Sequence, residues 1–157
     1  MKKYVLLFLG ALVLTTGTAF GKISDDRIAL GGIAIGCSEE YVREVYGPPK
    51  TVGREFYAPR GQYIREYIYG DSFSLSFLED GTVFRMMSME LPNGIATPDG
   101  ICVGSPYTDI LARYGEPDLR QIDGEVDHFW YFGEGESGNL VFHVSYGKVI
   151  GIVCGKK

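Results

Sequence analysis

The chain has 157 residues, of which 45% are apolar and 22% charged, a composition typical of an ordinary globular protein that can bury a core. There are 20 acidic against 15 basic side chains, and the net charge is -5. Because nucleic acids and anionic membrane surfaces are bound by clustered Lys and Arg, which this sequence lacks, we expect neither as a partner.

The first 21 residues have the three parts of a secretory signal peptide. Lys2 and Lys3 give a positive start, residues 4–14 form an apolar run, and residues 19–21 match a small-x-small cleavage site. The apolar run is shorter than the roughly 20 residues that a membrane-spanning helix needs. We therefore predict cleavage near Gly21-Lys22 and no transmembrane segment afterwards. The mature chain is expected to be exported, to a periplasm or out of the cell.

The rest of the chain contains an internal repeat. Residues 32–49 align with residues 100–117 without a gap, at a constant offset of 68 positions. Chance rarely produces such a match, and a repeat has to be recognised before a fold is assigned. We therefore predict that the second half of the chain is a copy of the first. The identical pairs are Gly32/Gly100, Ile33/Ile101, Gly36/Gly104, Tyr46/Tyr114, Gly47/Gly115 and Pro49/Pro117.

The correspondence continues downstream with small shifts. Residues 67–70 correspond to 130–133, and residues 81–83 correspond to 147–149. The connector 91–100 is rich in Pro and Gly, which indicates the boundary between the copies. It is too short for a flexible tether, so the two copies should form one structural unit. The predicted divisions are the signal peptide (1–21), repeat 1 (22–91) and repeat 2 (92–157).

Each copy is predicted to begin with a short helix. In the second copy Ser105 is expected to be the N-cap and Pro106 the first helical residue, and Gly115 ends the helix. In the first copy the helix ends at Gly47. Both helices are short enough to need a sheet to pack against. Their apolar stripes are Tyr41, Val42, Val45 and Tyr46 in the first copy and Tyr107, Ile110, Leu111 and Tyr114 in the second.

Antiparallel strands are predicted to follow each helix, because polar and apolar residues alternate there or are bounded by Gly turns. The fold class is therefore α+β, with two tandem helix-plus-antiparallel-sheet repeats that share one continuous sheet and have their helices on one face. The expected strands are 63–69, 72–77 and 83–89 in the first copy and 128–132, 140–145 and 148–154 in the second.

The repeat resembles a known structural unit. Each copy begins with the pattern G-[IV]-x-[IV]-G, at residues 32–36 and 100–104. An amphipathic helix that ends in Tyr-Gly-x-Pro follows, and then a strand that ends in an aromatic pair and a hairpin with Gly-x-Val. This pattern resembles the repeat of the secreted beta-lactamase inhibitor protein fold. It is also similar to the single repeat of the SmpA/OmlA lipoproteins of the outer-membrane barrel assembly machinery. The resemblance, over residues 31–154, implies a doubled helix-plus-sheet repeat whose sheet face binds protein.

Two departures limit what this resemblance implies. The assembly lipoproteins carry a lipid-attachment Cys near the start of the mature chain, whereas the first Cys here is Cys37. The cysteine spacing also differs from the paired arrangement of the inhibitor. The first departure argues against the lipid-anchored role of the assembly lipoproteins, and inhibition of a lactamase is not carried over, because a fold does not determine a function.

Three cysteines leave at least one thiol free or paired between molecules. A Cys102–Cys154 disulfide is the favoured arrangement, and three reduced thiols are the alternative. Cys37 aligns with Ser105 at the start of a helix, where a lowered thiol pKa can make a nucleophile. Because no His is nearby in sequence to act as a base, we interpret Cys37 as a small capping or buried residue.

The two histidines, His128 and His143, lie in predicted strands of the second copy and are interpreted as surface polar residues. Two His with no metal-binding motif predict no metal site, and no cofactor is expected. Residues 133–138 spell G-x-G-x-x-G, but the segment carries two Glu and joins two strands. A dinucleotide loop joins a strand to a helix, so we predict a hairpin loop here.

One face of the predicted sheet is unusually apolar, which is typical of an interface. With Tyr67, Tyr69, Trp130 and Phe132 turned inward, aromatic and aliphatic residues point outward. A register wrong by one residue, or a covering loop, would change this set. The candidate binding residues are Ile64, Glu66, Ile68, Phe84, Met86, Phe129, Tyr131 and His143, with Val141 beside them.

The sequence therefore predicts an exported, non-catalytic module that binds a protein or cell-envelope component through its sheet face, as an inhibitor or an assembly accessory. Two alternatives stay open. One is a small exported enzyme with Cys37 as a thiol nucleophile, and the other is a structural envelope protein without a specific partner.

Overall fold

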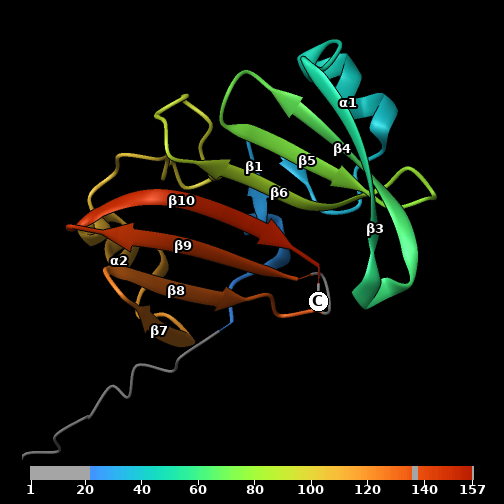
Figure 1. Cartoon of the computed structure of the whole chain (residues 1–157). Coiled ribbons are helices and arrows are strands. Elements are labelled where there is room, and N and C mark those ends of the chain that lie inside the picture. Colours follow the sequence, from blue (N-terminus) through green and yellow to red (C-terminus); the bar gives the residue numbers. More distant parts are fainter. Residues whose placement is uncertain (1–21, 136–137, 157) are drawn as a thin grey trace, which may run out of the picture.

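The computed structural model describes residues 22–135 and 138–156, and the predicted signal peptide lies outside them. In this part of the chain the fold is α+β, with an eight-stranded antiparallel sheet, a two-stranded sheet and two short α-helices (Figure 1). The helices are α1 (Glu39–Tyr46) and α2 (Tyr107–Tyr114). The strands are β1 (Ala29–Leu30), β2 (Ile33–Ala34), β3 (Thr51–Tyr57), β4 (Gln62–Tyr69), β5 (Phe73–Phe77), β6 (Val83–Met89), β7 (Leu119–Asp123), β8 (Val126–Phe132), β9 (Asn139–Ser145) and β10 (Lys148–Gly155).

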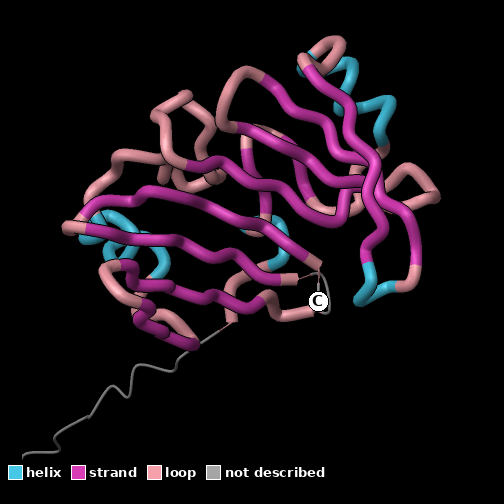
Figure 2. The backbone as a smooth tube through the Cα atoms, viewed as in Figure 1, coloured by secondary structure: helices cyan, strands magenta, loops and turns pink. Residues whose placement is uncertain are grey.

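The strand order in the large sheet is β3-β4-β5-β6-β10-β9-β8-β7. Helix α1 precedes the first four of these strands along the chain, and α2 precedes the last four, so each half of the sheet follows one helix. The last strand of each half, β6 and β10, pair antiparallel at the centre, where Met87 is opposite Val153. The sheet therefore runs without a break across both halves, as the tube in Figure 2 shows.

The same backbone hydrogen bonds attach the start of each helix to the hairpin behind it. The Gly36 N–H donates to the Val83 carbonyl, and the Gly104 N–H donates to the Val149 carbonyl, both at 2.8 Å. The bonds satisfy the backbone at each helix entry and fix its distance from the sheet. Three further pairs of N–H to carbonyl bonds match between the halves. In the first half they run from Val83 to Cys37, from Glu39 to Gly81 and from Lys50 to Ile68. In the second half they run from Val149 to Ser105, from Tyr107 to Gly147 and from Asp118 to Trp130.

The helix ends confirm the predicted stops and correct the predicted start. Gly47 and Gly115 end the helices with φ of 73° and 75° and extended ψ, a conformation that residues with a Cβ rarely adopt. The start of α2 lies one residue later than predicted, because Pro106 is extended (φ -62°, ψ 143°) and is the N-cap. Ser105 is therefore not a cap. In α1 the N-cap is Ser38, whose Oγ accepts a hydrogen bond from the Tyr41 N–H at 3.1 Å.

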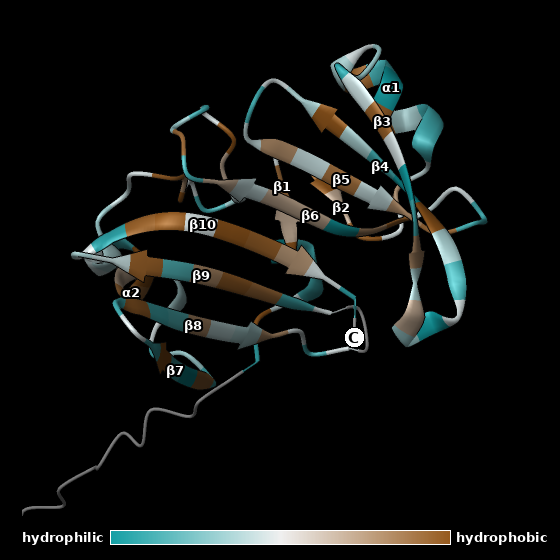
Figure 3. Cartoon of the chain, in the orientation of Figure 1, coloured by the Kyte–Doolittle hydropathy of each residue, from teal (hydrophilic) through white to brown (hydrophobic). Residues whose placement is uncertain are grey.

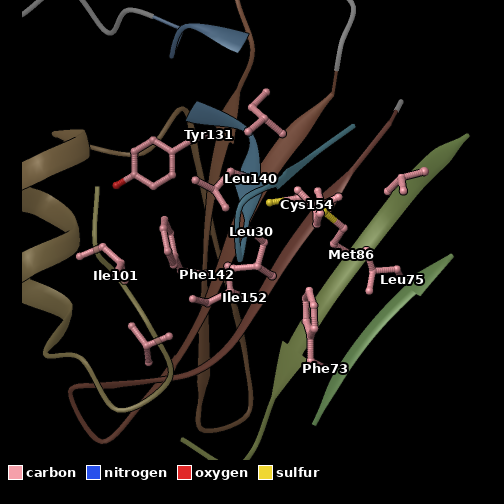
Figure 4. Packing of buried hydrophobic residues seen from close by; sticks show 14 of the residues in the cluster. Leu30, Phe73, Leu75, Met86, Ile101, Tyr131, Leu140, Phe142, Ile152 and Cys154 are labelled. Atoms are coloured by element: carbon pink, nitrogen blue, oxygen red, sulfur yellow. The ribbon is translucent and has the colours of Figure 1, made fainter. Parts of the chain in front are cut away.

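The core lies between the large sheet and a layer made of the two helices and the two-stranded sheet. Figure 4 shows Tyr131, Phe142 and Ile101 beside α2, with Leu30 of β1 between the two halves. The most apolar strands, β9 and β10, lie at or next to the centre of the sheet (Figure 3). Burial of Val42 and Ile110 places both helices on the same core, which both halves of the sheet share. Within the described ranges, no helix is long and apolar enough to cross a membrane.

Candidate functional site

In the described part of the chain, the large sheet has one face that packs on the core and one that no helix covers. Because side chains alternate along a strand and directly paired residues share a face, the pairings assign every position. Leu75, Met86 and Cys154 belong to the core. Their strand neighbours point the other way. We refer to that surface as the helix-free face.

One row of paired residues crosses all eight strands on the helix-free face. All its members are apolar except Thr51 and Ser74. Most are half-buried, and Leu119 at the β7 edge is 48% exposed. We call it the apolar row. In sheet order from β3 to β7 it consists of Thr51, Ile68, Ser74, Met87, Val153, Val141, Trp130 and Leu119.

A groove of about 220 Å³ follows the apolar row over β4, β5 and β6. Ile68, Met87 and Met89 supply its apolar lining, and two carboxylates lie at its rim. Asp71 forms an ion pair with Lys50, which lowers the pKa of the Asp71 carboxyl. Glu66 is half-buried and forms no ion pair with any residue in the described ranges. The groove is therefore apolar with an acidic border.

The edge strand β3 curls over part of the helix-free face. The Glu55 carboxylate of β3 lies 3.7 Å from the Arg85 guanidinium of β6, although two strands separate them in the sheet. Beneath this curl Ile64 is 1% and Phe84 is 3% exposed. Both residues were predicted to contact a partner. Ile64 is on the predicted face and Phe84 packs under the curl, but both are covered by the protein itself and cannot supply contact surface.

Three other predicted contact residues lie in the core. Met86, Phe129 and Tyr131 are at most 2% exposed, so the prediction that they point outward is wrong. The Tyr131 hydroxyl donates to the Gly115 carbonyl at 2.8 Å, which ties β8 to the end of α2.

The error in β8 is a shift of one residue. Tyr69 donates to the Gly47 carbonyl in the first half as Tyr131 does to Gly115 in the second, so the structural partner of Tyr69 is Tyr131 and not Phe132. Trp130 and Phe132 therefore lie on the helix-free face, and not inward as predicted. The predicted residues that do lie on this face with partial exposure are Glu66, Ile68 and His143.

The two histidines form a pair next to the apolar row. His128 of β8 is directly opposite His143 of β9, their Nδ1 atoms are 2.6 Å apart, and their rings are perpendicular. One Nδ1 donates and the other accepts, which requires opposite protonation at the two atoms. Burial lowers the pKa of His143, and the charge of His128 lowers it further. Both rings are half-buried and contact each other, so the interpretation of the two histidines as surface polar residues is only partly correct. This pair could have been predicted from the hairpin loop 133–138. A hairpin that closes there places Phe132 opposite Asn139, and the same register places His128 opposite His143.

All three cysteines are free, so the predicted Cys102–Cys154 disulfide is wrong. Cys154 points into the core, where burial raises the pKa of its thiol. The Cys102 Sγ lies 3.6 Å from the Ser105 Oγ at the entry to α2. Cys37 is half-buried one residue before the α1 N-cap, and its side chain makes no hydrogen bond in the described ranges. No described residue is therefore placed to act as a base for the Cys37 thiol.

The G-x-G-x-x-G segment joins antiparallel neighbours β8 and β9, as predicted for a hairpin loop. The Gly133 N–H donates to the Gly138 carbonyl at 3.0 Å, and residues 136–137 lie outside the described residues. In residues 22–135 and 138–156, no three His, Cys, Asp or Glu side chains gather in a way that could hold a metal ion.

No family model matches the sequence, and no curated protein matches it significantly. Solved structures with a similar fold include an extracellular protein containing an SCP domain from Bacillus anthracis str. Ames, with a TM-score of 0.50, 12% identity and coverage of 78% of this chain and 44% of that chain. This chain thus spans less than half the length of that protein. At this identity the likeness concerns the fold alone.

Two further structures are similar at the same 12% identity. A DUF4309 family protein (YjgB) from Bacillus subtilis subsp. subtilis str. 168 has a TM-score of 0.47, covering 80% of this chain and 83% of that chain. A proposed beta-lactamase inhibitor protein from Streptococcus mutans has a TM-score of 0.36, covering 82% and 86%.

Proposed function

We propose that this chain is an exported, non-catalytic binding module that holds an extended segment of a partner protein along the apolar row. The observation that carries this proposal is the row itself. Apolar side chains recur along the row from Ile68 to Leu119, on a face that no described helix covers. Ile68, Met87, Val153 and Trp130 are half-buried and Leu119 is exposed, while Ser74 and the buried Val141 lie between them. An apolar surface of this kind on a soluble protein is typical of an interface.

The chemistry of the groove defines the partner segment. Ile68, Met87 and Met89 offer an adaptable apolar lining, since Met side chains fit different shapes. Glu66 at the rim forms no ion pair with any described residue, and the whole chain is acidic. We therefore expect the partner to present large apolar side chains flanked by Lys or Arg, because opposite charges at the rim favour association. The signal peptide predicted at residues 1–21 directs the search to exported or envelope proteins.

We also infer that the two halves are copies of one repeat. Both helix entries make the same backbone bonds to their hairpins, and Tyr69 and Tyr131 make the same bond to the glycine that ends each helix. The antiparallel β6–β10 pair relates the halves by an approximate two-fold axis. Such a duplication doubles the width of one helix-plus-sheet unit and extends the helix-free face. The sequence resemblance to the inhibitor and SmpA/OmlA repeats supports the same use of the sheet.

The single tryptophan of the chain makes the proposal testable, because Trp130 lies within the apolar row. Peptides selected from a random display library against the untagged mature chain should alternate apolar residues and carry Lys or Arg. Their binding should shift the fluorescence emission of Trp130. Leu119→Ser should weaken binding at least severalfold. Ile122→Ser, on the opposite face of the same strand and 68% exposed, should not.

Two outcomes would overturn this proposal. One is a selected peptide that binds the two folded β7 variants equally well. The other is binding without any change in Trp130 emission, which would place the contact elsewhere on the molecule.

A further inference from the structure

The His128–His143 pair has more structure than two polar surface residues need. The two imidazoles come from directly opposed positions of β8 and β9, and both are half-buried. Their Nδ1 atoms face one another at 2.6 Å. The pairing of two rigid strands fixes the two side chains in place, which is the arrangement that a built binding site needs.

The distance between the two nitrogens is close to that required by one shared ion. Two imidazole nitrogens each about 2.0–2.1 Å from a metal lie roughly 2.9 Å apart when the N–metal–N angle is a right angle. A tetrahedral angle needs about 3.3 Å. The two nitrogens must therefore separate by about 0.3 Å for the square arrangement and by about 0.7 Å for the tetrahedral one. Each ring must also turn so that its Nδ1 lone pair points at the ion and not at the other nitrogen. Square-planar nitrogen coordination is typical of Cu²⁺ and Ni²⁺.

Gly151 lies beside the His143 ring. A Cβ added to Gly151 would lie 2.5 Å from the Met89 Sδ and 3.1 Å from the His143 Cδ2. The Cδ2 edge of the ring therefore faces Gly151, and Nδ1 lies on the other side of the ring. No third His, Cys, Asp or Glu joins the pair within the described ranges. Water or a group from a partner would complete the coordination.

Metal binding needs both imidazoles neutral, with no hydrogen on either Nδ1 atom. The hydrogen that one Nδ1 donates to the other moves to the Nε2 of the same ring, so both Nδ1 lone pairs then face the ion. No net proton is released from a neutral pair.

We propose that His128 and His143 together bind one Cu²⁺ ion through their Nδ1 atoms. The affinity of a nitrogen site for divalent ions rises from Co²⁺ through Ni²⁺ to Cu²⁺ and is lower again for Zn²⁺. We therefore expect Ni²⁺ and Zn²⁺ to bind the same site more weakly than Cu²⁺ does. The site is independent of the peptide-binding proposal, although both share the helix-free face.

The position of Trp130 gives a direct measurement of binding. Trp130 is two residues from His128 on the same face of β8, so their Cα atoms are separated by roughly 7 Å. Cu²⁺ quenches indole fluorescence at this range, whereas Zn²⁺ does not. Titration of the untagged mature protein with Cu²⁺ at neutral pH should quench Trp130 saturably with one ion per chain, and excess Zn²⁺ should restore the emission.

Two variants and one control locate the site. His128→Gln and His143→Gln should each weaken Cu²⁺ binding at least tenfold, because each removes half of the ligand set. Ser145→Ala, on the same face of β9 as His143, should bind as the wild type does. If copper binds at the terminal amine instead, neither His variant will weaken Cu²⁺ binding. Unchanged Cu²⁺ binding in both variants would therefore overturn the proposal.

A second measurement does not depend on the variants. The chain has two histidines, so its proton NMR spectrum contains two sets of imidazole signals. Both sets should shift together when Zn²⁺ is added. A shift in one set alone, or quenching that either His→Gln variant retains, would show that the two rings do not share an ion. Absence of saturable quenching up to about a hundred micromolar Cu²⁺ would likewise overturn the proposal.

Discussion

The ring of Tyr57 lies against the ring of Phe84, with centroids 5.3 Å apart, although β4 and β5 separate their strands in the sheet. In a flat sheet β3 and β6 would be about 14 Å apart, because adjacent strands are spaced by roughly 4.8 Å. The first half of the sheet therefore curls strongly on its helix-free face. The curl closes a second, small apolar cluster over Ile64 and leaves the apolar row as the open part of the face.

This small cluster should contribute to stability in spite of its distance from the main core. We expect Phe84→Ala to lower the free energy of unfolding by about 3–5 kcal/mol, the range for truncation of a buried Phe. Val52→Ala, at a position of β3 that is 56% exposed, should change it by less than about 0.5 kcal/mol. Urea denaturation followed by circular dichroism measures both. Equal effects of the two substitutions would mean that the curl does not persist in solution.

Two strand glycines should respond differently to the same added methyl group. Gly151→Ala would place a Cβ against Met89 and His143 in the centre of the sheet, and we expect a loss of about 1–3 kcal/mol from this crowding. In Gly53→Ala the Cβ would lie 3.9 Å from the nearest atom, so we expect no loss, or a small gain from the reduced freedom of the unfolded chain. Thermal unfolding of the two proteins under one buffer condition compares them directly. A similar decrease in both would show that Met89 moves aside at no cost.

The sequence predicted the elements of the fold better than it predicted the site. Local sequence signals predicted the ends of the helices at Gly47 and Gly115, the hairpin loop after β8 and the α+β class, and the structure has all three. The face of β8 could not be predicted in this way. Residues 129–132 read Phe-Trp-Tyr-Phe, which is equally apolar in either register, so alternation gives no preference.

Long-range contacts decided the remaining points. The hydrogen bond from Tyr131 to Gly115 selects the register of β8, and the curl of β3 covers Ile64 and Phe84. Neither contact has a sequence signal, because each joins elements through the tertiary arrangement. The histidine pair differs in this respect, since the predicted loop determines it.

The three thiols should separate into two classes in the native protein. Cys154 is fully buried and its thiol pKa is raised, so it should react with an alkylating reagent only after unfolding. Cys37 and Cys102 are half-buried and should react in the native state. Mass spectrometry of labelled peptides before and after denaturation counts both classes. Protection of Cys102 together with Cys154, lost on reduction, would instead reveal the disulfide that the structure lacks.

Acid should remove the stability that Glu39 contributes at the start of α1. The Glu39 carboxylate accepts hydrogen bonds from Arg65, at 2.5 Å, and from the Tyr67 hydroxyl. Partial burial raises the pKa of Glu39, but these two bonds outweigh it and hold the pKa below its usual value of 4.5. A carboxyl whose pKa is lower in the folded state stabilises the fold above its unfolded pKa. This contribution is lost as the pH falls below about 4.5.

Substitution isolates this contribution from the other carboxyl groups. We expect Glu39→Gln to lower the free energy of unfolding by about 1–2 kcal/mol at pH 7, the range for a partly exposed charged hydrogen bond. The difference from the wild type should shrink steadily as the pH falls below 4.5, because the wild-type carboxylate is then protonated. Glu44→Gln, on the exposed side of the same helix, should follow the wild-type curve throughout. Urea titrations between pH 3 and pH 7 measure all three proteins. A difference between Glu39→Gln and the wild type that stays constant over this range would show that the substitution acts by packing and that the charge of Glu39 does not stabilise the helix entry.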